Sequence, residues 1–81
     1  MRLELIVAGM LAVHAKHAVF AALAGVAGVT RAEVELGRVD LDVSRSDAEF
    51  EAVAAELRAA IDAVGYAVTE IRRLPRQLPT L

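Results

Sequence analysis

Hydrophobic residues recur with a period of two in some stretches and of about 3.6 in others, and the order of these stretches constrains the fold most. A period of two is typical of strands with one face on a core, and a period near 3.6 of amphipathic helices. Along this chain the order is strand, helix, strand, strand, helix, strand. The simplest closed arrangement is an α+β, ferredoxin-like βαββαβ sandwich, in which a four-stranded antiparallel sheet carries both helices on one face.

The first strand and the first helix are separated by a glycine. Residues 3–7 alternate between apolar and more polar positions, which predicts a strand that Gly9 ends. From about Val13 the pattern becomes helical, and Gly25 and Gly28 are expected to end that helix. Its apolar stripe consists of Ala15, Val19, Ala22, Leu23 and Val26.

Two further alternating runs follow the first helix, with very little chain between them. The first covers residues 29–36 and the second residues 39–43. One face of this pair is apolar, and it comprises Ala32, Val34, Leu36, Val39, Leu41 and Val43. Because only Gly37-Arg38 separates the runs, we predict a two-residue type II′ hairpin and antiparallel neighbours.

A capping box is predicted at the start of the second helix, where Ser46 is followed three residues later by Glu49. The apolar stripe of this helix consists of Phe50, Val53, Leu57, Ile61 and Val64. Gly65 ends the helix, and residues 66–71 read as the last strand. We therefore assign residues 1–72 to one domain and residues 73–81, which have two prolines and no period, to a flexible tail.

Composition excludes several classes of function. The chain has 81 residues, 57% of them hydrophobic, and a net charge of −2, so we expect no partnership with nucleic acid or an anionic membrane. It contains no cysteine, which excludes disulfides and thiolate chemistry. Glu4 interrupts the first apolar run, which is too short to span a bilayer, so a cytoplasmic location is expected.

Several glycines and apolar residues resemble the frame of the heavy-metal-associated domain, a family found in copper chaperones, in the mercury-binding periplasmic protein and in the N-terminal tails of metal-transporting P-type ATPases. The matching positions are Gly9-Met10, Val19, Ala22-Leu23, Gly28-Val29, Leu57, Ile61 and Gly65-Tyr66. The resemblance covers about residues 3–71 and implies the ferredoxin-like fold. In that topology the loop after the first strand, Gly9 to Ala15, lies beside the loop before the last strand, so we expect it to meet Gly65-Tyr66.

The family holds soft ions such as Cu(I) through two thiolates, one in this loop and one at the start of the helix. The matching positions are Ala12 and Ala15, which offer only methyl groups, so the thiol site does not carry over. Either both cysteines were replaced deliberately, or the chain belongs to a natural branch that lost them. We favour the natural branch, because Leu11 and Phe20 also depart from the residues that the family usually carries there.

His14 and His17 are the remaining candidates for metal ligands, because neutral imidazoles bind zinc, nickel or Cu(II). They are about 60° apart on the helical wheel, on the side opposite to the core stripe. Such a pair would form at most a weak site. Met10 could add a thioether, although a core filler is the more ordinary role for it.

The outer side of the first helix has almost no charge, since His17, Phe20 and Ala24 lie there. A helix that is apolar nearly all round is usually buried on both sides. These residues therefore predict a protein interface, in a homodimer or in docking to a metal-transporting ATPase or a similar domain. An alanine-rich composition, in which alanine simply fills helix positions, accounts for the same pattern.

Two functions remain open, and neither is enzymatic, because the sequence has no Ser, His and acid constellation and no phosphate-binding glycine loop. In the first, the chain is a heavy-metal-associated-domain protein similar to metal chaperones, with at most a weak metal site at His14, His17 and Met10. In the second, it is a metal-independent interaction module that binds through its first helix.

Overall fold

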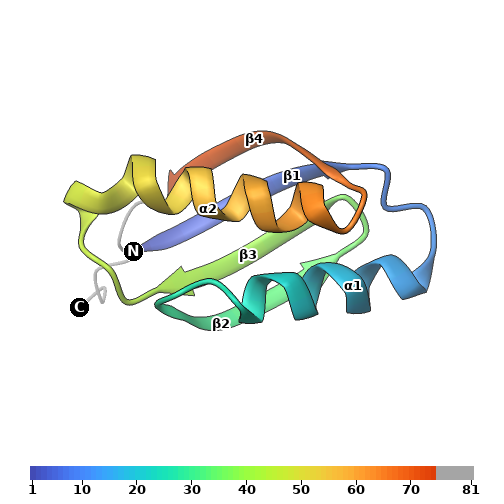
Figure 1. Cartoon of the computed structure of the whole chain (residues 1–81), viewed down its shortest axis with the longest axis horizontal. Coiled ribbons are helices and arrows are strands. Elements are labelled where there is room, and N and C mark those ends of the chain that lie inside the picture. Colours follow the sequence, from blue (N-terminus) through green and yellow to red (C-terminus); the bar gives the residue numbers. More distant parts are fainter. Residues whose placement is uncertain (75–81) are drawn as a thin grey trace, which may run out of the picture.

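The computed structural model describes residues 1–74, and these form the predicted βαββαβ sandwich. The elements are β1 (Arg2–Ala8), α1 (Val13–Ala24), β2 (Val29–Glu35), β3 (Arg38–Val43), a short 3-10 helix η1 (Asp47–Glu49), α2 (Phe50–Ala63) and β4 (Ala67–Leu74). The strands form one antiparallel sheet in the order β2-β3-β1-β4. Both helices lie side by side over one face of this sheet (Figure 1).

The core lies between the helices and the sheet, and the predicted stripes supply it. β1 and β3 are the central strands and bury alternate residues completely, because both have a neighbour on each side. The buried core consists of Leu3, Leu5, Val7, Met10, Ala15, Val19, Leu23, Val26, Val39, Leu41, Val43, Val53, Leu57 and Ile61. No helix among residues 1–74 is long and apolar enough to cross a membrane.

The hairpin between β2 and β3 differs from the predicted one. Glu35 pairs with Arg38, so the turn residues are Leu36 and Gly37 and not Gly37-Arg38. Gly37 has a φ of +84°, whereas Leu36 keeps a negative φ. A positive φ at the second central residue alone is the pattern of a type II turn, so the predicted type II′ turn is wrong. As a turn residue, Leu36 leaves the apolar face of β2 and is 50% exposed.

The start of the second helix also differs from the prediction. Ser46 makes no side-chain cap, and η1 precedes α2, whose first residue is Phe50. The backbone N–H of Glu49 donates to the carbonyl oxygen of Ser46 at 2.9 Å and not to its hydroxyl, and the carboxylate of Glu49 accepts from Arg45 at 3.3 Å. The predicted capping box is therefore wrong, although the predicted second helix is present.

The last strand is longer than predicted. β4 runs from Ala67 to Leu74, so Arg73 and Leu74 of the expected tail belong to the sheet, where Arg73 pairs with Leu3 of β1. The guanidinium of Arg73 lies 5.5 Å from the centre of the Phe50 ring, a cation–π distance. The rest of the predicted tail, residues 75–81, lies outside the described residues.

Candidate functional site

The loop between β1 and α1 owes its shape to Gly9. This residue has a φ of +94°, which residues with a side chain rarely adopt. A Cβ placed there would lie 3.4 Å from Cδ1 of Tyr66. Ala8 pairs with Ala67 just before the loop. The predicted meeting of this loop with the segment at Gly65-Tyr66 is thus confirmed at Gly9 and Tyr66.

Ala12 and Ala15 take up the two positions that carry thiols in the family frame, and they differ in exposure. Ala12 is the extended N-cap residue of α1, is exposed, and accepts the backbone N–H of Ala15 at 2.9 Å. Ala15 is only 1% exposed and belongs to the core. Neither methyl group can coordinate a metal ion, so these two positions supply no ligand.

The two histidines lie where the helical wheel predicted them. His14 and His17 are both exposed on the first turns of α1, away from the sheet, while Lys16 between them reaches Glu35 at 3.9 Å. Within residues 1–74 no group of three or more His, Cys, Asp or Glu residues could hold a metal ion together. Met10 is 5% exposed and packs in the core, which is the filler role that the sequence favoured.

Four large apolar side chains are exposed at the end of the molecule that contains this loop, and we call Leu11, Val13, Leu36 and Val64 the apolar tip. Their exposed fractions are 91%, 67%, 50% and 40%, respectively. They come from the β1–α1 loop and the start of α1, the β2–β3 turn, and the end of α2, which lie together at one end of the sheet (Figure 1). The backbone N–H of Val7 donates to Gly37 at 2.9 Å and so holds the β2–β3 turn against β1.

Sequence patterns placed two of these tip residues elsewhere. Leu36 was assigned to the apolar face of β2, and Val64 to the stripe of the second helix, but α2 ends at Ala63 and Val64 is its C-cap. Leu11 was noticed only as a departure from the family frame. The signal that could have found the group is its position, because all of these residues stand at turns that the predicted topology brings to one end.

The first-helix residues predicted to bind a partner are divided between two places. Phe20, 52% exposed, and Ala24 line a groove of about 370 Å³ between α1 and β2, whereas His17 is not among the residues that line it. The remaining lining residues are Val29, Thr30, Arg31 and Ala32. Phe20 therefore lies beside the β2 edge of the sheet, in a groove that no residue of the apolar tip lines.

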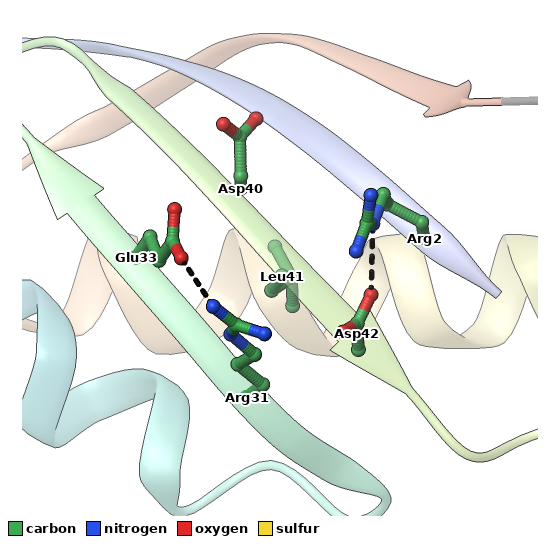
Figure 2. Close-up of a pocket in the computed structure, with 6 residues that line it drawn as sticks. All are labelled: Arg2, Arg31, Glu33, Asp40, Leu41 and Asp42. Atoms are coloured by element: carbon green, nitrogen blue, oxygen red, sulfur yellow. Dashed lines mark hydrogen bonds and ion pairs between the residues drawn. The ribbon is translucent and has the colours of Figure 1, made fainter. Parts of the chain in front are cut away.

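The face of the sheet without helices carries charged residues in ion pairs (Figure 2). A shallow depression of about 190 Å³ there is lined by Arg2, Arg31, Glu33, Asp40, Leu41 and Asp42. Arg2 donates from Nε to Asp42 at 3.1 Å, and this hydrogen bond raises the pKa of Arg2 above the ordinary value for arginine. Arg31 likewise donates from Nη2 to Glu33 at 2.7 Å. The charged groups thus pair with each other, which is typical of a solvated sheet face.

Comparison with known proteins shows where this fold occurs. No protein-family model and no curated protein sequence matches the chain. Among solved structures, it is 31% identical to the CopZ metallochaperone, with 85% of this chain and 100% of that one covered and a TM-score of 0.70. It is 26% identical to a copper-binding domain of HMA7, a P-type ATPase, over 90% of this chain and 96% of that one, with a TM-score of 0.69.

A third structure extends the similarity of fold. The N-terminal domain of PacS from Synechocystis PCC6803 is 19% identical, with 90% and 98% of the two chains covered and a TM-score of 0.73. The identity to the metallochaperone over its whole length agrees with the loop geometry at Gly9 and Tyr66. This protein, which has no cysteine, therefore belongs to the heavy-metal-associated domain family.

Proposed function

We propose that this protein is a docking module that binds a partner domain through the apolar tip without carrying metal. The observation that carries the proposal is the contrast at one end of the molecule: the thiol positions are alanine, while Leu11, Val13, Leu36 and Val64 are exposed. Exposing this much apolar surface at one site is unfavourable in water, and such surface marks interaction sites. No catalytic step is assigned to the chain.

The partner we propose is the N-terminal domain of a metal-transporting P-type ATPase, or a domain like it. Support comes from the structural relatives, which include a copper-binding domain of such an ATPase and a metallochaperone. A chain that keeps the fold but has lost the thiols could still contact this kind of domain through its loop end. It would then compete with a metal-carrying relative or hold the partner in one state. The encounter belongs to the cytoplasm, the compartment expected from the sequence.

The experiment is an NMR titration of the 15N-labelled protein with the N-terminal domain of a P-type ATPase from the same organism. We expect shift changes around Leu11, Val13 and Leu36, unchanged by EDTA. A Leu11→Ser/Val13→Ser variant should bind roughly tenfold or more weakly, because both side chains lose apolar area that the complex would bury. Both residues are mostly exposed, so the variant should fold normally.

The matched control is Phe20→Ser, which removes an exposed apolar side chain from the α1–β2 groove instead. This variant should bind the domain as the original chain does. Binding that requires added metal, or that Phe20→Ser weakens and the tip variant does not, would show that the proposed surface is wrong.

A histidine metal site is the second candidate, favoured by the exposure of both His14 and His17 on one side of α1. Isothermal titration with zinc, nickel and Cu(II) tests it. Micromolar or tighter binding, about 8 kcal/mol or more, that is lost in a His14→Ala/His17→Ala variant would support the site. Equal heats of binding for the original chain and the double variant would show that the two histidines do not form a metal site. Two imidazoles without a third protein ligand leave most of the coordination to water, so weak binding is the expected outcome.

A further inference from the structure

The two edge strands of the sheet differ in how they are covered. At the β4 edge, Arg58 of α2 donates from Nη1 to the backbone carbonyl of Val68 at 2.9 Å. At the β2 edge, no side chain within the described part of the chain donates to a backbone carbonyl of residues 30–35. An uncovered edge strand presents free N–H and C=O groups to any strand that can pair with it.

The backbone groups that β2 offers follow from its hairpin with β3. Glu35 and Arg38 flank the two-residue turn, and a pair in this position exchanges both of its hydrogen bonds. Because an antiparallel ladder alternates, the N–H and C=O of Ala32 and Val34 point away from β3. Ala32 is the middle residue of β2, so its backbone groups lie at the centre of the free edge.

The charges beside Ala32 make β2 complementary to a second copy of itself. Arg31 and Glu33 lie on the face of the sheet without helices and form an ion pair of 2.7 Å there (Figure 2). If two β2 strands pair antiparallel about a two-fold axis at Ala32, Arg31 of each copy stands opposite Glu33 of the other. Directly opposed residues of unlike charge stabilise such a pair, and here there are two such pairs.

Other registers do not give this match. A two-fold axis at Glu33 opposes that carboxylate with its own copy, an axis at Arg31 brings two guanidinium groups together, and an axis at Val34 opposes Glu33 with Glu35. Among these axes, which all keep the helices of both copies on one face, only the one at Ala32 gives opposite charges without a like-charge pair.

Apolar surface borders the same edge on the helix face. Phe20 is 52% exposed and lines the groove of about 370 Å³ between α1 and β2, together with Ala24 and Ala32. The two-fold axis at Ala32 brings the grooves of the two copies next to each other. Pairing would therefore cover part of the Phe20 ring in addition to satisfying the backbone groups.

We propose that two copies of this chain join their sheets along β2, in the antiparallel register centred on Ala32. The joined sheet is continuous and takes four strands from each copy. The register shift between Val29 and Arg31 puts an irregularity at Thr30, so regular pairing about Ala32 covers residues 31–33. This interface does not include the apolar tip, so the dimer leaves the tip free, and either proposal can fail without the other.

The test measures the dimer dissociation constant of the full chain by sedimentation over a wide range of concentrations. Arg31→Glu and Glu33→Arg should each raise it roughly tenfold or more, because each turns two attractive pairs into repulsive ones. The double variant Arg31→Glu/Glu33→Arg exchanges the two charges, so it should recover the original value. The matched control is Glu51→Arg, an equal change of charge on the exposed side of α2, which should leave the constant unchanged.

Mixing the single variants guards against a trivial loss of folding. Each variant alone should dimerise weakly, whereas an equimolar mixture of R31E and E33R chains should form a heterodimer, because residues 31 and 33 of one chain then face opposite charges on the other. The amide of Ala32 should exchange with solvent more slowly as concentration rises. A chain that stays monomeric at millimolar concentration, or a dimer that E33R and E51R affect equally, overturns the proposal. So does a dimer that Phe20→Ser disrupts and E33R leaves intact.

Discussion

At the scale of single residues, Gly9 determines the loop that would otherwise carry the metal site. We expect Gly9→Ala to lower the free energy of unfolding by about 1–2 kcal/mol, because its φ of +94° is strained for any residue with a side chain. The new methyl would meet Cδ1 of Tyr66 at 3.4 Å, an ordinary contact distance, so the cost arises from the backbone conformation. Urea unfolding of the two proteins measures the difference.

Gly25→Ala is the matched control for this substitution. Gly25 has a φ of −83°, which alanine adopts without strain, and a Cβ there would meet the carbonyl oxygen of Ala22 at an ordinary 3.5 Å. This variant should be neutral or slightly more stable, because alanine loses less conformational entropy on folding. Equal loss of stability in both variants would mean that the loop conformation at Gly9 contributes nothing specific.

At the scale of elements, the sequence predicted both α-helices, all four strands of the described residues and nearly the whole core, but not the 3-10 helix η1. This succeeded because the central strands β1 and β3 and the inner stripes of the helices bury one side only, which enforces clean periodicity. The errors fall at the ends of elements. The turn of the hairpin is at Leu36-Gly37, one residue before the predicted position, and Ser46 does not cap α2. Such ends depend on a few contacts, for example Glu49 with Arg45, that no hydrophobic period records.

The candidate site was less predictable than the elements for the same reason. The exposure of His14 and His17 follows from helical geometry and was predicted. The core role of Met10, a loop residue, was favoured from the nature of its side chain. The apolar tip was not predicted. Leu36 and Val64 fit the apolar pattern of their elements in the sequence, but in the structure Leu36 lies in the β2–β3 turn and Val64 is the C-cap of α2. The groove beside Phe20 also required the position of β2 next to α1, which is a tertiary contact.

At the scale of the whole molecule, this chain has the family fold although it has no cysteine. The core closes around Ala15, and Gly9 lies against Tyr66, in a chain that has no cysteine. Hydrophobic packing therefore supplies the stability, and two thiols would add binding without being needed for folding. The fold therefore needs no thiols at positions 12 and 15, which is what the proposed docking function requires.

This independence predicts that the thiol site can be put back. The double variant Ala12→Cys/Ala15→Cys should bind one Cu(I) ion with micromolar or tighter affinity, at least about 8 kcal/mol, because two thiolates at the N-terminal end of α1 select a soft ion. Competition with a coloured Cu(I) chelator measures the affinity under reducing conditions. Ala12→Ser/Ala15→Ser is the matched control, since hydroxyls are poor ligands for Cu(I), and it should not compete. If the cysteine variant also fails to compete, the loop has drifted from the family geometry although the fold has not.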